Sequence, residues 1–370
     1  MLKFQGAASF RARLVLATVS GRPLRLDDIR AGDEQPGLRE YEASLLRLIE
    51  KVTDGCAVEI NETGTRLKYK PGIVINGARV EHDCGTSRGI GYFLEPLVLL
   101  SLFGKKPLSI TLKGLTNDGV DPSVDTWRTV TLPLLKHAVG EDAAFELKVL
   151  SRGAPPGGGG VVLLQCPAVR ALQPIELVDE GMVKRVRGIA HSMLVAPQTS
   201  SRLVDGARGV LNKLLADVFI FTDHMSGKQG GASPGYGVTL VAETTSGCLL
   251  SAELTVQEGR RLAAEGGGEG GDVVAEDIGC KAAQLLLEEV AKGGVVDSCH
   301  QGLLLTLCAL GPAEVSSVRL GPLTPHAVAT LRHLRDVLDV RFSIKPEAHS
   351  QTLFLTCIGS GIKNAAKRVT

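Results

Sequence analysis

The 370-residue sequence has no C-x-x-C pair, no long apolar run and almost no net charge. Its eight cysteines lie far apart, most of them in apolar stretches such as "LLTLCALG". We therefore expect reduced, mostly buried thiols in an intracellular protein, without disulfides or a cysteine metal site. The N-terminus "MLKFQGAASF" lacks the apolar core of a secretory signal, and no apolar run approaches the roughly 20 residues of a membrane span. We expect a soluble protein with no membrane partner.

Positive and negative charges nearly cancel along the chain. Forty-one Lys and Arg residues stand against forty Asp and Glu residues, which gives a formal net charge of +1. Such a chain has no overall electrostatic field that would draw it to nucleic acid. Any RNA contact must therefore be local or be made through a partner.

One pattern of helix-like and strand-like segments occurs three times. Each copy has an apolar helix, a strand, an amphipathic helix and two strands around a turn, so the order is α-β-α-β-β. The copies span 10–72, 91–166 and 301–359. Three such units can bury their apolar sheet faces against one another or under their own helices.

The ends of the helices repeat as well. Each first helix ends at a glycine, which suits a C-terminal cap with a left-handed backbone. Each second helix begins near a proline, which is tolerated in a first helical turn. The glycines are Gly21, Gly104 and Gly311, and the prolines are Pro36, Pro122 and Pro325.

About 100 residues with a different order separate the second copy from the third. They read as a strand, a helix, three strands and a helix, with Gly-rich loops at 225–237 and 263–271 that we expect to be solvated connections. The predicted fold class is α/β (α+β), with three repeated α-β-α-β-β units forming a core and one inserted smaller α/β domain. The predicted division places units one and two at 1–180, the insert at 181–293 and unit three at 294–370.

The stretch 151–161, "SRGAPPGGGGV", combines four glycines with two prolines. It lacks the Lys-Ser/Thr of a nucleotide-binding loop and joins two strands, so we do not expect a P-loop. Two interpretations stay open. The exposed backbone N–H groups next to Arg152 could hold an anion, or the segment could simply form a hairpin corner.

Among eight histidines, His326 stands at the start of a helix in "GPLTPH". A helix N-terminus attracts phosphate and favours a neutral imidazole, so a nucleophilic histidine would suit this place. The alternatives are a surface residue at His326 and an ordinary helix residue at His333. His82 and Cys84 are too close in sequence, and lack a second ligand pair, for a zinc site. We predict no metal site.

Ordered motifs along the whole chain resemble those of the RNA 3′-terminal phosphate cyclase superfamily, and more closely those of its cyclase-like branch. They include "RLVLATVSGRPLRL", "PGLREYEASLLRLIEKVT", "GIGYFLEPL", "RGAPPGGGG", "RVRGIAHS", "SPGYGVTLVAETTSG" and "CIGSGIKN". The fold implied by this resemblance is three repeated α/β units plus a smaller inserted domain. The repeat pattern indicates the same arrangement independently.

The resemblance implies a site that has lost catalytic groups. Cyclases adenylate a histidine, pass AMP to an RNA 3′-phosphate and close a 2′,3′-cyclic phosphate with metal assistance. Here their metal-binding Glu falls on Phe4 and their Gln on Ala8. Glu42 stands where they have a histidine, and Gly157 stands where an arginine precedes their glycines.

His326 aligns with the nucleophilic histidine of the cyclases. Without the metal ligand and the phosphate clamps it should be almost inert, because phosphoryl and nucleotidyl transfer depend on positioning and charge neutralisation. We therefore predict no catalytic residue, no cofactor and no metal. The candidates for contact with an anion or RNA are Arg11, Arg152, Gly158, Gly159 and Gly160.

By the same resemblance we expect a non-catalytic ribosome biogenesis factor of the small-subunit processome. It would act in pre-rRNA processing toward 18S rRNA, with a processome GTPase, pre-rRNA and snoRNP as partners, in the nucleus and nucleolus. The alternative is an RNA-processing enzyme. It would be either a residual RNA 3′-end adenylyltransferase or cyclase that uses His326, or an endonuclease that cuts pre-rRNA.

Overall fold

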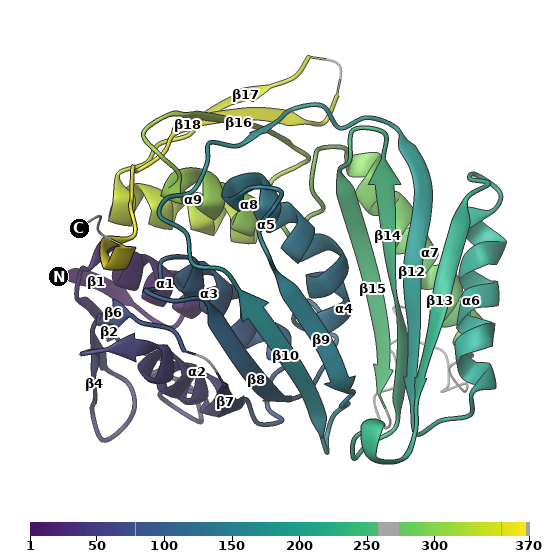
Figure 1. The fold of residues 1–370 in the computed structure, drawn as a ribbon, viewed down its shortest axis with the longest axis horizontal. Helices are drawn as coiled ribbons and strands as arrows, with labels where there is room; N and C mark the ends of the chain where they lie inside the picture. The colour runs from purple at the N-terminus through teal and green to yellow at the C-terminus, as the bar shows by residue number, and fades with distance from the viewer. Residues whose placement is uncertain (78, 258–273, 349, 368–370) are drawn as a thin grey trace.

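The computed structural model describes residues 1–77, 79–257, 274–348 and 350–367. Figure 1 shows three α/β units beside one another and, at one end, a further sheet with two helices on one face. All four of these sheets have four strands. Within the described ranges no helix is long and apolar enough to cross a bilayer. The predicted fold class, a repeated α/β core with an inserted α/β module, is confirmed.

Each unit begins with one more strand than the sequence predicted, so its order is β-α-β-α-β-β. Unit one consists of β1 (Leu2–Gln5), α1 (Phe10–Ser20), β2 (Leu24–Asp27), α2 (Glu40–Val52), β4 (Ala57–Ile60) and β5 (Leu67–Lys70). Its sheet has the order β1-β2-β5-β4, and β1 runs parallel to β2. A short ladder of β3 (Thr53–Asp54) with β6 (Ile73–Val74) follows.

Units two and three repeat this arrangement. Unit two consists of β7 (Val80–Asp83), α3 (Ile90–Leu102), β8 (Leu108–Gly114), the continuous helical segments α4 (Val124–Thr126), η1 (Trp127–Thr131) and α5 (Leu132–Val139), then β9 (Glu146–Ser151) and β10 (Gly160–Cys166). Unit three consists of β11 (Glu176–Leu177), α8 (Gln301–Leu310), β16 (Val315–Leu320), α9 (Pro325–Leu338), β17 (Ser343–Pro346) and β18 (Leu353–Ile358). In both units the extra first strand again pairs in parallel with the second.

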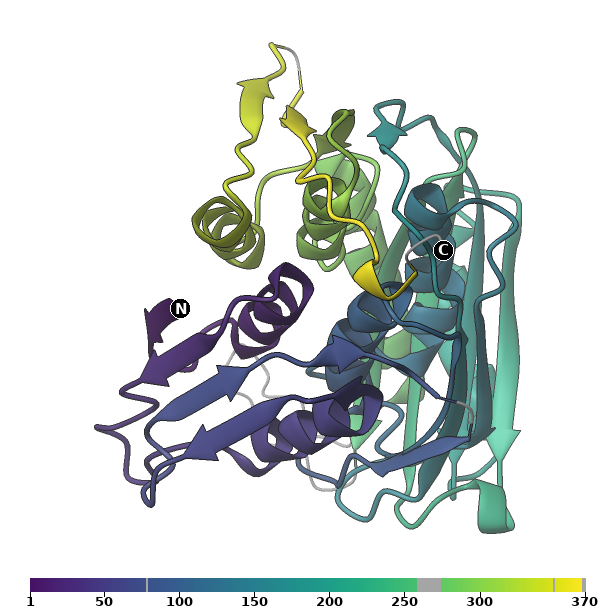
Figure 2. The same cartoon turned by 60° about the vertical axis from the view of Figure 1, so that its left-hand side comes forward.

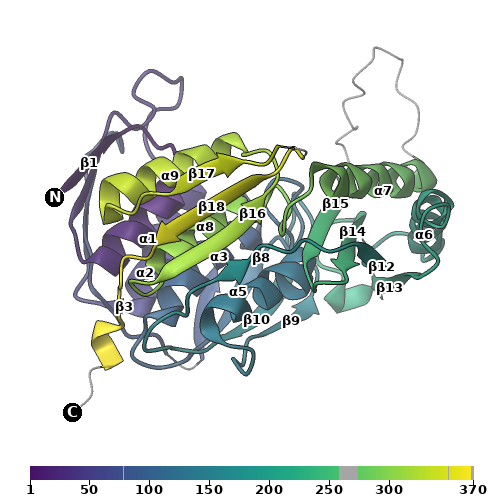
Figure 3. The ribbon, with the colours of Figure 1, turned by 90° about the horizontal axis from the view of Figure 1, so that it is seen from above.

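The insert consists of β12 (Val183–Met193), α6 (Gln198–Leu211), β13 (Val218–Met225), β14 (Gly235–Thr244), β15 (Leu249–Gln257) and α7 (Ala275–Lys292). Its sheet has the order β13-β12-β14-β15, and Figure 3 shows α6 and α7 on one face of it. An apolar cluster of its own lies between that face and the two helices. Because β11 precedes the insert yet pairs with β16, residues 176–177 belong to the third sheet. The predicted division into domains stays a prediction.

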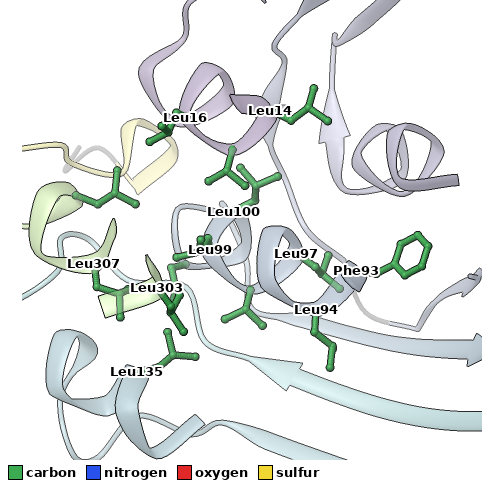
Figure 4. Packing of buried hydrophobic residues seen from close by; sticks show 14 of the residues in the cluster. Leu14, Leu16, Phe93, Leu94, Leu97, Leu99, Leu100, Leu135, Leu303 and Leu307 are labelled. Atoms are coloured by element: carbon green, nitrogen blue, oxygen red, sulfur yellow. The ribbon is translucent and has the colours of Figure 1, made fainter. Parts of the chain in front are cut away.

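The first helices of the three units form the centre of the core. In α3 and α8 almost every residue is buried, as expected for helices that are apolar on all sides. Figure 4 shows Leu14 from α1, Leu99 from α3 and Leu303 from α8 among the side chains of one buried cluster. The sheets lie outside these helices. Their strands accordingly alternate between residues buried against the core and more exposed residues.

The predicted helix caps are correct in part. Gly21 has a left-handed backbone with φ 66° and caps α1. Gly311 is extended instead, and Gly104 is not left-handed but lies where a Cβ atom would overlap the Asn76 side chain. Pro325 is the first residue of α9, as predicted. The Gly-rich loop expected at 263–271 lies outside the described residues.

Candidate functional site

Four helices begin around one pocket of about 230 Å³. They are α1, α2, α3 and α9, and they belong to all three units. In each of the four cases a strand precedes the helix, and the connection between them lies at the edge of the core that holds the pocket. Helix N-termini carry partial positive charge, so their convergence favours a negatively charged ligand. The pocket is lined by Ala7, Ser9, Phe10, Arg11, Ala12, Arg30, Tyr41, Glu42, Arg88, Tyr92, Glu95 and His326.

Arg11 and His326, two residues selected from the sequence, both line this pocket. Arg11 Nη1 lies 3.4 Å from Glu95 Oε2 and 3.5 Å from Asp121 Oδ1, and it donates to the Tyr92 carbonyl at 3.2 Å. The Arg11 guanidinium also lies 4.6 Å from the centre of the Tyr92 ring. Its charge is therefore already shared between two carboxylates and an aromatic face.

Arg88 is a second pocket arginine with a carboxylate partner. Its Nε and Nη2 atoms donate to the two oxygens of Asp121 at 2.5 and 3.3 Å. Burial raises the pKa of Asp121, and the hydrogen bond from Arg88 opposes this rise. The same guanidinium lies 5.2 and 5.3 Å from the ring centres of Tyr41 and Tyr92. Arg88 thus connects the start of α3 to the loop before α4.

Arg30 is the third pocket arginine, and Glu42 neutralises it. Two parallel hydrogen bonds of 2.8 and 2.7 Å join the guanidinium to the carboxylate, which is the strongest common geometry for such a pair. The buried Glu42 also accepts the Arg39 N–H at 2.8 Å and so stabilises the first turn of α2. Glu42, which the resemblance places at the position of a cyclase histidine, is therefore part of an internal ion pair.

The charges of the pocket cancel as a set. Arg11, Arg30 and Arg88 contribute three positive charges, and Glu42, Glu95 and Asp121 contribute three negative ones. A phosphate or an RNA end would have to displace these carboxylates to obtain bidentate contacts. The ion pairs fix the three arginine side chains and leave the pocket without a net positive charge that would attract an anion.

His326 is exposed at the second position of α9, where the Thr324 hydroxyl accepts the Ala327 N–H at 3.1 Å. The imidazole ring packs against Gly302 of α8. A Cβ atom at this glycine would stand only 2.8 Å from two atoms of the ring. His326 is thus held at a helix N-terminus in the same pocket as Arg11.

Arg152 lies elsewhere and has a structural role, which corrects the predicted anion contact. Its side chain is fully buried and makes two hydrogen bonds to Asp125, at 2.7 and 2.9 Å. Two more, at 2.9 and 2.7 Å, join it to Asp223 of the insert, and one at 3.3 Å joins it to Asn117. Burial alone would raise the pKa of Asp125, but the Arg152 guanidinium lowers it to about 2. Arg152 joins unit two to the insert and is closed to solvent.

The glycine run also packs against the insert and does not line the pocket. Gly157 donates its N–H to the Ser233 hydroxyl at 2.9 Å, and Gly158 accepts the Ala232 N–H at 3.0 Å. Gly158 and Gly159 are left-handed, with φ 68° and 90°, and a Cβ atom on Gly160 would lie 2.7 Å from the Gly114 carbonyl oxygen. The segment is a hairpin corner pressed against loop 225–237, which is a packed contact and not the solvated connection predicted from its composition.

Phe4, which the resemblance places at the position of the cyclase metal ligand, forms part of a stacked cluster. Its ring is 5.5 Å from that of His333, and the Arg13 guanidinium lies 4.7 Å from the Phe4 ring centre. Arg13 Nε donates to His333 Nε2 at 2.9 Å. Burial lowers the pKa of His333, which favours the neutral acceptor that this bond requires. Among the described residues there is no group of three His, Cys, Asp or Glu side chains that could hold a metal ion.

Sequence reasoning missed most of the pocket. Arg30, Tyr41, Arg88, Tyr92 and Glu95 line it beside Arg11 and were not selected. Arg88 and Tyr92 lie at the start of α3, and Arg30 and Tyr41 lie before and in the first turn of α2, so these residues meet only in the folded chain.

Three β-α-β-α-β-β units with an α/β insert, around a pocket where helix N-termini of all units meet, define a protein of the cyclase fold class. The chain belongs to the RNA 3′-terminal phosphate cyclase family, whose sequence model matches residues 2–344.

Relatives that match over the full length are named as cyclase-like proteins or as an rRNA processing protein. The RNA 3′-terminal phosphate cyclase-like protein of Mus musculus is 49% identical over 99% of this chain and 97% of its own length. A probable protein of the same description from Arabidopsis thaliana is 50% identical over 100% of this chain and 99% of its own length. The rRNA processing protein rcl1 of Schizosaccharomyces pombe is 43% identical over 99% of this chain and 98% of its own length.

Proposed function

We propose that this chain is a non-catalytic factor of rRNA processing, which acts in the small-subunit processome during maturation of 18S rRNA in the nucleolus. The observation that carries this proposal is the pairing of the three pocket arginines with carboxylates. The printed name of the Schizosaccharomyces pombe relative supports the assignment to rRNA processing. Pre-rRNA and snoRNP are the partners that this role requires.

The charge balance of the pocket argues against cyclase chemistry. Nucleotidyl transfer requires preorganised positive charge or a metal ion at the transferring phosphate. Here Glu42 holds Arg30, Asp121 holds Arg88, and Phe4 stands where cyclases have a carboxylate ligand. The transition state would develop negative charge in a pocket that has none of its cations free.

One observation favours a residual adenylyltransferase as a second candidate. His326 is exposed at the N-terminus of α9 and shares the pocket with Arg11. Purified chain incubated with α-labelled ATP and Mg²⁺ or Mn²⁺ tests it, beside the His326→Ala variant and an active cyclase as positive control. We expect no covalent AMP on either form. Label on the wild-type chain that the variant loses would refute the non-catalytic assignment.

Depletion and complementation in cells test the role itself. Loss of the chain should lower mature 18S rRNA relative to large-subunit rRNA and accumulate its uncut precursor, and both effects should be reversed by wild-type chain and by His326→Ala. Normal 18S rRNA after depletion would refute the proposal. Purified chain should also leave an RNA that spans the cleavage site intact, whereas specific cutting would identify an endonuclease.

We further propose that the processome GTPase docks, by an acidic segment with apolar side chains, on a groove of about 660 Å³ between α9 and β17. The groove combines an apolar floor with three arginines, which suits such a segment by shape and charge. Arg335 and Arg341 have exposed ion pairs with Asp336 and Asp339, whereas Arg332 has no carboxylate partner in the described part of the chain. β17 is the edge strand of its sheet. The lining residues are Leu323, Val328, Leu331, Arg332, Arg335, Val340, Arg341, Phe342 and Ile344.

A pull-down with the full-length GTPase tests this docking surface. The variant Arg332→Glu/Arg341→Glu should lose the GTPase, because it reverses two charges at the groove. Lys213→Glu/Lys281→Glu makes the same change in net charge at exposed positions of the insert and should retain it. Retention by the groove variant would place docking elsewhere.

A further inference from the structure

The outer face of the first sheet carries a row of charged residues that crosses all four strands. The register aligns Lys3 of β1 with Arg25 of β2, Arg25 with Lys68 of β5, and Lys68 with Glu59 of β4. The rows on either side add Lys70 to this face and place Arg66 beside Asp27. Figure 2 brings this sheet forward. The opposite face, with Leu24 and Leu26, is buried under α1 and α2.

Positive charge accumulates on this face although the whole chain is nearly neutral. Five cations stand against the carboxylates of Asp27 and Glu59, a surplus of three, whereas the entire sequence has a formal charge of +1. Asp27 is shared, because it accepts hydrogen bonds of 2.7 Å from both Arg25 and Arg66. In the described part of the chain neither Lys3 nor Lys70 has an ion-pair partner. The cations are Lys3, Arg25, Arg66, Lys68 and Lys70.

Folding alone does not favour this row. Side chains directly opposite each other on neighbouring strands are about 5 Å apart, and like charges in such positions destabilise a sheet. Lys3, Arg25 and Lys68 form two successive pairs of this kind. A bound polyanion removes the repulsion, because its charges lie between the cations.

The composition of the face indicates which polyanion it binds. No large apolar or aromatic side chain shares the charged row. Leu24, Leu26, Leu67 and Tyr69 are buried on the opposite face, and Ile60, which is 47% exposed at the end of β4, pairs with Leu67 and belongs to that opposite face as well. A protein partner would need an apolar anchor at the centre of the contact, and base stacking would need exposed aromatic rings. A phosphate backbone needs neither and binds through Lys and Arg alone.

We propose that the outer face of the first sheet binds the sugar–phosphate backbone of single-stranded RNA without reading its bases. This inference rests on the proposed role in rRNA processing and adds to it the surface that contacts RNA directly. The face lies at the end of the molecule opposite the insert, as Figure 1 shows. It is separate from the pocket residues around His326 and from the groove beside β17.

Fluorescence anisotropy with a labelled 20-nucleotide oligo(U) tests the proposal. The full-length chain is titrated at 50 to 200 mM KCl beside the variant Lys3→Gln/Lys68→Gln/Lys70→Gln. Each lost phosphate contact should reduce the slope of log K against log salt by about 0.7, so the variant should lose about 2. A fourfold rise in salt should then cost the wild-type chain about 20-fold more affinity than it costs the variant.

The matched control is Lys213→Gln/Lys228→Gln/Lys281→Gln, which removes the same charge from exposed lysines of the insert. It should keep the wild-type slope, and oligo(C) of equal length should give the same differences as oligo(U). An unchanged slope in the sheet variant, an equal loss in the control, or a base-dependent effect would overturn the proposal. Loss of binding to a poly-glutamate peptide, with RNA binding retained, would assign the face to an acidic protein and also overturn it.

The test separates this inference from the proposed function. If depletion blocks 18S maturation and the sheet variant keeps its slope, the inference is refuted and the function stands. If the variant loses its slope and depletion leaves 18S rRNA normal, the function is refuted and the RNA-binding face stands.

Discussion

Replacing Arg152 with Met should destabilise the protein by about 3–5 kcal/mol, the usual cost of removing one partner from a buried ion pair. The substitution abolishes five hydrogen bonds and leaves Asp125, which is fully buried, without its bidentate partner. Asp125 alone accounts for about 2 kcal/mol, because its pKa is lowered from 3.8 to about 2 and each unit corresponds to about 1.4 kcal/mol.

Urea unfolding followed by tryptophan fluorescence measures this loss well. Trp127 is the only tryptophan, is buried, and lies two residues after Asp125. The matched control is Arg187→Met, which removes an equally bidentate but exposed pair with Asp217 and should cost less than about 1 kcal/mol. A loss of under about 1 kcal/mol for Arg152→Met would refute the argument that this network joins unit two to the insert.

If Arg152→Met does not fold, Asp223→Asn answers the same question. Asp223 is one-third exposed, so its removal should cost about 1 kcal/mol and leave the Arg152–Asp125 pair intact. A stability equal to wild type would show that the contact from the insert contributes nothing.

Acid should weaken the same network. The folded-state pKa of Asp125 lies below its unfolded value, so the unfolded chain binds more protons between about pH 5 and pH 2, and stability falls as pH is lowered through this range. Asp125→Asn should be less stable than wild type at pH 7 and should show a flatter loss of stability between pH 5 and pH 2. Parallel curves for the two proteins would contradict the lowered pKa.

Two further predictions concern the glycine corner and the pocket. Gly158→Ala should cost about 2–3 kcal/mol by urea unfolding, because its φ is positive and a Cβ atom would lie 2.9 Å from Thr86. Gly119 has a similar φ of 69° but open space around it, so Gly119→Ala should cost only about 1 kcal/mol. Equal losses would show that packing around Gly158 is unimportant. Glu42→Gln should bind inorganic phosphate about tenfold more tightly than wild type by calorimetry, because it frees Arg30. The control Glu59→Gln, at an exposed position, should bind phosphate like wild type. Unchanged affinity in Glu42→Gln would refute competition between Glu42 and phosphate for Arg30.

The repeat could be predicted from sequence because its signals are local. The apolar first helices and the amphipathic α2 and α9 follow from periodicity alone. The first strands β1, β7 and β11 have only two to four residues, and their parallel pairing with distant strands leaves no local pattern. These strands form because the folded chain places a pairing strand beside them, and their own short sequences do not predict them.

The error at Arg152 has the same origin. Beside four glycines this residue has the sequence context of an anion contact, but its partners Asp125 and Asp223 are 27 and 71 residues away. Arg11 and His326 were selected by resemblance, and both line the pocket, whereas Arg30 and Arg88 could be identified only once the helix N-termini had been brought together. Whether an arginine is free to bind a ligand depends on carboxylates far away in the sequence, and a single sequence does not show these pairings.

The contacts that neutralise Arg11 in the pocket also join unit one to unit two. Arg11 of unit one reaches the Tyr92 carbonyl of unit two, and Arg22 of unit one donates to the Val337 carbonyl of unit three at 2.7 Å. Arg13 reaches His333 of unit three in the same way. An anion that captured Arg11 would have to compete with the contacts that join unit one to unit two. Tight packing of the units and tight phosphate binding at Arg11 are therefore opposed in this chain, and the structure shows the side chain used for packing.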